Sequence, residues 1–257
     1  MNKKRAYLLI GLLAFIIGLI KFAPATIISQ YIANKTANII LLSNAQGTIW
    51  QGHAELAISS DQTNALTLGP IDWDIKASRL LLGELNIAIH WNNSESMTLT
   101  MTPTQLSIAN LNIELPANAF STLVPSLSAA QLGGQLRIST SSFNMTHLNN
   151  ANLKPNFTGQ IQLDWQQASS RLSAINPLGQ YKASINGVND QIFIKVATQN
   201  GPLILEGDGI LNQENGLLFS GSASAENNQK QALTPLLHVL GNEAIAGNGR
   251  YKINFGH

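Results

Sequence analysis

Two patterns of apolar residues divide the chain. The positions from Ala6 to Ile20 carry no charge, and a second apolar patch runs from Phe22 to Ile28. Beyond about Leu41 apolar and polar residues alternate instead, as they do from Leu85 to Trp91. A long uncharged run is typical of a helix in a membrane, whereas alternation is typical of half-buried strands. The sequence therefore predicts a transmembrane helix followed by a mainly β, largely antiparallel body.

The alternating segments are short and recur to the end of the chain. They are Leu85–Trp91, Met97–Met101, Leu111–Leu115, Ile161–Trp165, Tyr181–Ile185, Ile192–Val196, Leu203–Leu205 and Leu217–Phe219. Pairs of residues that favour turns punctuate them, among them Gly69-Pro70, Gly133-Gly134, Asn186-Gly187 and Asn200-Gly201. Regular punctuation of this kind predicts a twisted antiparallel sheet.

Two short helices are expected to cover the sheet. One spans Ala117 to Leu123, between two prolines, and the other starts at the cap-like pair Thr234-Pro235 and ends before Gly241. A weak internal echo, in which Asp72-Trp73 and Asp164-Trp165 each precede an Ala-Ser segment, suggests two similar β units. We place these units at residues 29–120 and 131–257.

The basic residues at the N-terminus predict an orientation. Lys3, Lys4 and Arg5 precede the apolar segment, and only Lys21 follows it closely. By the positive-inside rule, residues 1–5 are a cytoplasmic stub, residues 6–28 are a single-pass signal anchor, and the body lies across the membrane. In a bacterium that compartment is the periplasm. Apolar residues continue at helical spacing through Ile32, as if one helix ran on. The alternative is a cleaved signal peptide, since Ala23-Pro24-Ala25 matches a cleavage site.

Composition excludes several kinds of site. The 257 residues are 44% hydrophobic and 11% charged, with a formal charge of +1 and no cysteine. Without cysteine there are no disulfides, thiolate metal sites or cysteine nucleophiles, and the chain lacks the basic excess that nucleic-acid binding requires. We find none of the common catalytic or phosphate-binding motifs. The sequence predicts a protein that is not an enzyme and uses neither cofactor nor metal.

A few isolated polar residues are candidate metal ligands. His53 and Glu55 share one face of a strand, but the further ligands that a zinc site needs are missing. Asp72 and Asp74 flank Trp73, where a solvated face is a better interpretation than a calcium site. Asp208 stands between two glycines and is interpreted as a turn residue.

The four tryptophans allow two interpretations. Trp50, Trp73, Trp91 and Trp165 are all expected on strands, where buried aromatic residues usually belong to the core. If they lined one concave face instead, they would bind an acyl chain or a partner strand. The core is the favoured interpretation.

Several motifs, taken in order, resemble the type II secretion system protein N family. The resemblance begins with the Pro24-Ala25 pair, the Gly-Thr-x-Trp-x-Gly segment at 47–52 and the Leu-Gly-Pro-Ile-Asp-Trp segment at 68–73. It continues with the segments at 158–165, 177–181 and 198–209. The motif positions, expected to serve structure or interaction, are Pro24, Gly47, Trp50, Gly52, Trp73, Trp165, Gly179, Gly201, Pro202, Gly207 and Gly209.

The resemblance implies a function. Such a protein is a non-enzymatic component of the type II secretion system, anchored in the inner membrane and facing the periplasm, that helps to export folded proteins across the outer membrane. Its partners are other components of the inner-membrane platform, with the secretin as a further candidate. An alternative is an AsmA-like envelope protein, whose β groove binds or carries lipid acyl chains.

Overall fold

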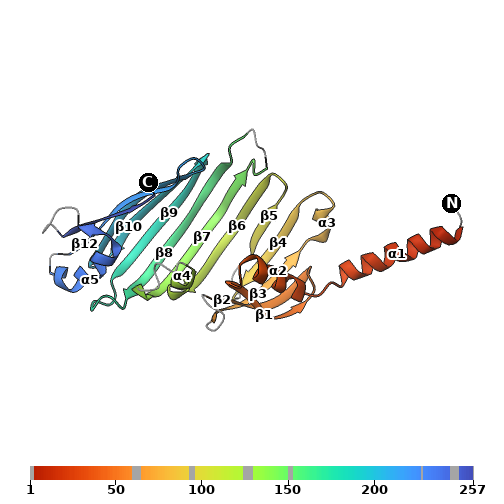
Figure 1. Cartoon of the computed structure of the whole chain (residues 1–257), viewed down its shortest axis with the longest axis horizontal. Coiled ribbons are helices and arrows are strands. Elements are labelled where there is room, and N and C mark those ends of the chain that lie inside the picture. Colours follow the sequence, from red (N-terminus) through yellow and green to blue (C-terminus); the bar gives the residue numbers. More distant parts are fainter. Residues whose placement is uncertain are drawn as a thin grey trace. The chain divides into compact units, whose positions relative to one another are not determined.

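The computed structural model describes residues 3–59, 65–92, 96–123, 130–149, 153–226, 228–243 and 249–256. By compactness the chain divides into two units, Met1–Asn93 and Ser94–His257, and most of their elements are labelled in Figure 1. Within the described residues the chain is mainly β, as predicted. The predicted pair of similar units at 29–120 and 131–257 stays a prediction.

The first unit has two N-terminal helices and four antiparallel strands, each paired with the next along the chain. The helices are α1 (Lys3–Lys21) and α2 (Thr26–Lys35), and α2 packs against β1. The strands are β1 (Ile40–Gly47), β2 (Gln51–Ser59), β3 (Ala65–Ile75) and β4 (Leu85–Trp91), with the single turn α3 (Ala77–Leu80) before β4.

The expectation of one continuous N-terminal helix is wrong, because α1 ends at Lys21 and α2 begins at Thr26. Pro24, which has no amide hydrogen to donate, lies in the break. The residues on either side of it form strand-like hydrogen bonds instead: the Ala25 amide donates to the Gly47 carbonyl (3.1 Å), and the Ile49 amide donates to the Ala23 carbonyl (2.9 Å). Among the residues that the structure describes, no helix is both long enough and apolar enough to cross a membrane.

The second unit is an antiparallel sheet with two helices near one end of its strands (Figure 1). The helices are α4 (Asn118–Leu123), at the predicted place, and α5 (Lys230–Leu240). The strands, in spatial order, are β5 (Met97–Met101), β6 (Gln105–Pro116), β7 (Leu132–Thr146), β8 (Asn156–Ser170), β9 (Gly179–Asn189), β10 (Gln191–Asn200), β11 (Leu203–Asn212), β12 (Gly216–Ala225), β14 (Arg250–Phe255) and β13 (Asn242–Glu243).

Across β7, β8 and β9 the pairing register gives this sheet one apolar and one polar face. Successive residues of a strand point to opposite faces, so residues that are directly paired share a face. One row across β7, β8 and β9 is apolar and the next is charged. These rows are Leu136, Trp165 and Tyr181, and Arg137, Asp164 and Lys182. The two helices lie on the apolar side, where α5 buries its leucines with Tyr251 and Leu203.

Three of the predicted turns lie inside strands. Gly69 has φ +122° in β3 and Gly134 has φ +99° in β7, and both coincide with shifts in strand register. These glycines form β-bulges, which need the same backbone freedom as a turn. Gly187 lies within β9, where a Cβ would come within 2.8 Å of the Phe157 Cβ and 3.0 Å of its backbone, so this glycine allows β8 to approach closely. The Asn200-Gly201 turn is found between β10 and β11, as predicted.

The start predicted for the last helix is also wrong. Helix α5 begins at Lys230, so Pro235 lies inside it, and the Thr234 hydroxyl donates to the Lys230 carbonyl (2.8 Å) rather than capping the helix. An interior proline costs about 3 kcal/mol. Burial of three leucines at roughly 1.5–3 kcal/mol each outweighs that loss. They are Leu233, Leu236 and Leu237, each at most 2% exposed.

Candidate functional site

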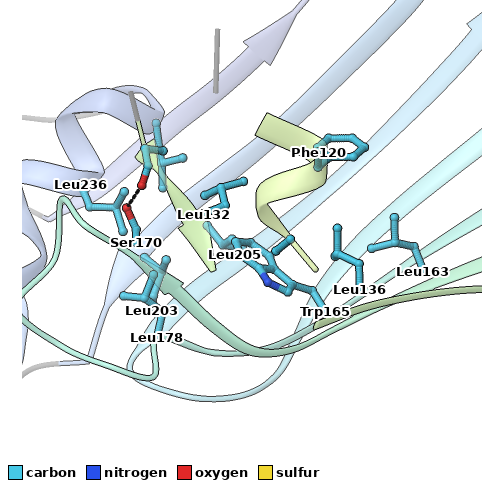
Figure 2. A pocket seen from close by; sticks show the side chains of 13 residues that line it. Phe120, Leu132, Leu136, Leu163, Trp165, Ser170, Leu178, Leu203, Leu205 and Leu236 are labelled. Atoms are coloured by element: carbon cyan, nitrogen blue, oxygen red, sulfur yellow. Dashed lines mark hydrogen bonds between the residues drawn. The ribbon is translucent and has the colours of Figure 1, made fainter. Parts of the chain in front are cut away.

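An apolar pocket of about 220 Å³ is the most distinctive concave feature of the second unit. It lies between helices α4 and α5 and the apolar face of the sheet, as Figure 2 shows from close by. The wall is formed by Ala117, Phe120, Ala130, Leu132, Leu136, Leu163, Trp165, Ser170, Leu178, Leu203, Leu205, Leu236 and Leu240. The surface that these residues present to the pocket is entirely apolar.

The polar side-chain atoms of the wall are used within the protein. The buried hydroxyl of Ser170 donates to the Ala130 carbonyl at 2.6 Å, a bond drawn in Figure 2. The indole nitrogen of Trp165 donates to the Gly133 carbonyl at 3.0 Å. Hydrogen bonds satisfied in this way leave nothing in the wall to bind a polar ligand.

Two glycines bring the chain segments of the pocket floor together. Gly201 has φ +124°, and a Cβ on it would lie 2.3 Å from the Cα of Gly179. This close approach sets Leu178 beside Leu203, whose amide donates to the Leu178 carbonyl at 3.2 Å. Both leucines are at most 2% exposed and line the pocket. The neighbouring Pro202 accepts a hydrogen bond from the Glu226 amide at 2.9 Å.

Tyr181 supports the floor from within the sheet. Its ring lies 5.5 Å from that of Trp165, centroid to centroid. Its hydroxyl is 3.0 Å from the Leu178 carbonyl and 2.9 Å from the Leu203 carbonyl, and donates its proton to one of them at a time. Burial raises the pKa of Tyr181 above its usual range, so this donor stays protonated.

The glycines at 207 and 209 make room for one aromatic ring. Cβ atoms on Gly207 and Gly209 would lie 2.4 Å and 2.8 Å from the ring of Phe219 on the paired strand β12. That ring in turn lies 6.0 Å from the Phe255 ring. The two glycines thus serve packing.

The motif positions in the first unit form a second cluster. Pro24 bridges to Thr48, and the Trp50 indole donates to the carbonyl of Ile20, close to the end of α1, at 2.8 Å. Gly47 has φ +89° beside the backbone of Gln51. A Cβ on Gly52 would lie 2.3 Å from the Trp73 ring, which packs with Ala25 and Ala54. This cluster joins the end of α1 to the β1–β2 hairpin.

Comparison with known protein families gives one match. Residues 39–254 match the family model described as type II secretion system (T2SS), protein N. The chain belongs to the type II secretion system protein N family. Neither the curated proteins nor the solved structures gave a match.

The match to the protein N family runs from β1 into β14, so it covers the β body and leaves out helices α1 and α2. Both glycine-supported features, the hairpin around Gly52 and the pocket floor at Gly179 and Gly201, lie inside it. Pro24 lies outside the matched residues. The roles of the individual motif positions stay predictions.

The tryptophans of this family member divide between the two interpretations. Trp73 and Trp91 are 7% and 8% exposed and belong to the core, as favoured. Trp50 lies between β1 and β2, so its expected place on a strand is wrong. Trp165 lines the pocket, which agrees with the alternative of a concave apolar surface.

The isolated polar candidates lie on solvated strand faces. His53 Nδ1 is 2.7 Å from Asp72 Oδ1, and the Gln51 side-chain amide donates to Asp74 at 2.6 Å. His53, Asp72 and Gln51 are exposed and Asp74 is half-buried. Asp208 is an exposed residue of β11 and not of a turn. In the described parts of the chain, no three metal-ligating side chains come together.

Most of the pocket wall is not predicted from the sequence. Leu178 and Leu203 stand directly beside motif glycines and Leu236 lies on a predicted covering helix, yet none of the three is among the predicted site residues. A buried leucine has the same signature whether it fills a core or lines a cavity. The only signal was the pair of segments Pro177-Leu178-Gly179 and Gly201-Pro202-Leu203.

Proposed function

We propose that this chain is a non-enzymatic component of the type II secretion system, held in the inner membrane by the apolar helix α1, with its β body in the periplasm. The observation that carries the proposal is the family match across β1 to β14. The body acts by binding other components of the system, and so assists the export of folded proteins. A sheet suits this role, because its edges and apolar surfaces bind partners without any reactive group.

The apolar N-terminal helix supports the anchor. Large side chains of α1 such as Leu8, Phe15 and Ile17 are exposed. In water this would leave a long apolar surface unburied, whereas in a bilayer the same side chains contact hydrocarbon. The basic residues 3–5 orient the N-terminus to the cytoplasm, so the rest of the chain crosses to the periplasm.

Contacts at the end of α1 support retention of this anchor. Cleavage after Ala25 would remove a residue that is 1% exposed and packs with Ala54 and Trp73. It would also remove the carbonyls of Ala23 and Ile20, which accept hydrogen bonds from Ile49 and Trp50. A segment this closely built into the first unit is a poor substrate for a signal peptidase.

Strand β1 offers a surface for a partner. It ends the order of paired strands in the first unit, and its residues 40–47 pair with β2 on one side. At the two ends of this edge the Ile40 amide donates to the Thr36 hydroxyl and the Gly47 carbonyl accepts from Ala25, so an added strand would pair with the backbone between them. We assign this edge to contact with the inner-membrane platform.

Two experiments test the proposal. The first deletes the gene and measures export of folded substrates, with plasmid-borne wild-type chain as the control. We expect export to fall and to return on complementation, and we expect platform proteins to co-purify with the chain. Unchanged export together with no co-purification would overturn the secretion role.

The second experiment measures the mass and membrane association of the mature chain. We expect a protein that begins at Met1 and remains with membranes after alkaline extraction. A mature chain that begins at Thr26, or that is released by extraction, would overturn the anchor without touching the secretion role.

A further inference from the structure

We propose that the pocket of the second unit binds a linear acyl chain. This inference goes beyond the proposed secretion role. The first support is the chemistry of the wall, which presents no polar atom to the pocket. The second is size. Because a cavity of about 150 Å³ holds a benzene molecule, a pocket of about 220 Å³ accommodates roughly nine carbon atoms.

A polypeptide segment fits this pocket poorly. An extended peptide brings amide and carbonyl groups that need hydrogen-bond partners when they are buried. The two polar side chains of the wall, Ser170 and Trp165, are already bonded to backbone carbonyls. A helix satisfies its own backbone, but one turn about 5.4 Å tall and 10 Å wide occupies roughly 400 Å³. An acyl chain needs no hydrogen-bond partner and is much narrower than a helix.

The apolar surface continues from the pocket along the sheet. In Figure 2, Phe120 and Leu163 lie on the side of the pocket away from Leu236. On the same strand face as Leu163 follow Ile161 and its paired neighbours Ile185 and Ile194, all partly exposed. A chain longer than the pocket would therefore lie along β8, β9 and β10, with its polar end in solvent.

Photo-cross-linking in intact cells tests this inference with the full chain. Phe120 is replaced by p-benzoyl-phenylalanine, which forms bonds to nearby C–H groups under ultraviolet light. The matched control carries the same replacement at Phe193, which is similarly exposed, at 39% against 36%. Phe193 lies beside Ile210 on the face of the sheet opposite the pocket, since its neighbour Ile194 is on the pocket face. After irradiation the protein is purified and digested, and the masses of the peptides are measured by mass spectrometry.

We expect the peptide with residue 120 to carry an acyl adduct, at least about tenfold more often than the peptide with residue 193. The mass of the adduct distinguishes a free fatty acid from a phospholipid. Equal labelling at both positions, an adduct that is a peptide, or no adduct at position 120 would overturn the proposal. This comparison leaves Leu163 and the rest of the wall unchanged.

A second comparison tests the wall itself. In the chain that carries the photoreactive group at position 120, Leu163→Glu puts a carboxylate where the acyl chain would leave the pocket. Gln160→Glu puts the same group at an exposed position on the opposite face of the same strand. We expect Leu163→Glu to reduce the acyl adduct about tenfold and Gln160→Glu to leave it unchanged. Equal labelling of a Leu163→Glu chain that retains wild-type protease resistance would overturn the inference. The comparison of positions 120 and 193 decides it even where this variant fails to fold.

Discussion

The close approach at Gly201 makes a sharp prediction for Gly201→Ala. This glycine has φ +124°, a conformation that side-chain-bearing residues rarely adopt. An added Cβ would lie 2.3 Å from the Cα of Gly179 and 2.5 Å from the carbonyl oxygen of Leu178. Both are backbone atoms, so no side-chain rotation relieves the overlap. The substitution must therefore push the pocket floor away from β11.

The size of the effect follows from two terms. Holding alanine in a sparsely populated conformation costs about 1–3 kcal/mol. Forcing packed atoms apart costs a further 1–3 kcal/mol or so. Gly201→Ala should thus lower the free energy of unfolding by about 4 kcal/mol. For a chain of this size, roughly 2–4 °C of melting temperature correspond to 1 kcal/mol, so we expect a fall of about 8–16 °C.

Gly216→Ala is the matched control. Gly216 also has a positive φ, +67°, but a Cβ there would have no atom within 4 Å. Only the conformational term remains, about 1 kcal/mol, which corresponds to a fall of roughly 2–4 °C. The assay is thermal unfolding of the full chain followed by the β-sheet circular dichroism signal. If the two variants melt within about 2 °C of each other, the argument from close approach is wrong.

Three further predictions concern buried groups around the pocket. Leu233→Ala removes a side chain that is 0% exposed and should lower the free energy of unfolding, measured by urea titration, by about 3–4 kcal/mol. Val239→Ala, on the exposed side of the same helix, is the control and should change it by less than about 0.5 kcal/mol. Ser170→Ala leaves a backbone carbonyl without its donor and should cost about 1–2 kcal/mol in the same titration; no change would contradict the geometry at 2.6 Å. Burial raises the pKa of Tyr181 in the folded protein, so as the pH rises through about 10 this phenol loses its proton only in the unfolded chain. The stability that the group contributes is therefore present below that pH and is lost above it. Tyr181→Phe should therefore reduce the alkaline fall in the urea midpoint, and Tyr31→Phe, at an exposed position, should leave it as in the wild type; equal falls in both variants would refute the assignment.

Much of the fold could be predicted because strand alternation depends only on neighbouring residues. The alternating run Leu85–Trp91 is β4 to the residue, and the run Ile161–Trp165 lies inside β8. The mistakes come from residues whose local preference serves more than one structure. Gly134 supplies a positive φ to a bulge as readily as to a turn, and Pro235 is kept inside α5 because the helix buries its leucines. Only tertiary packing decides these cases.

The pocket could not be predicted in the same way. Its wall combines Leu136, Leu178, Leu203 and Leu236, which are far apart in the sequence and meet only in the folded unit. The sequence contains the glycines that allow the approach, but not the shape that results. Trp165 shows the limit clearly. That it lines a concave apolar surface follows only from the strand register, which places Leu136 and Tyr181 beside it.

The energetics of the pocket connect the acyl inference with the proposed anchor. At about 24 cal/mol per Å³, an empty enclosed cavity of about 220 Å³ would forfeit roughly 5 kcal/mol, an upper value for a pocket open on one side. An acyl chain taken from water gains about 0.8 kcal/mol for each buried methylene, or roughly 7 kcal/mol for nine carbons. A chain taken from a bilayer already lies in hydrocarbon, so it gains only the better packing of the pocket. Exchange with a membrane is therefore nearly balanced and reversible, whereas a chain captured from water would be held far more strongly. A β body anchored at the membrane surface would therefore load and release acyl chains by direct exchange with the bilayer. Without the anchor, each acyl chain would have to pass through water.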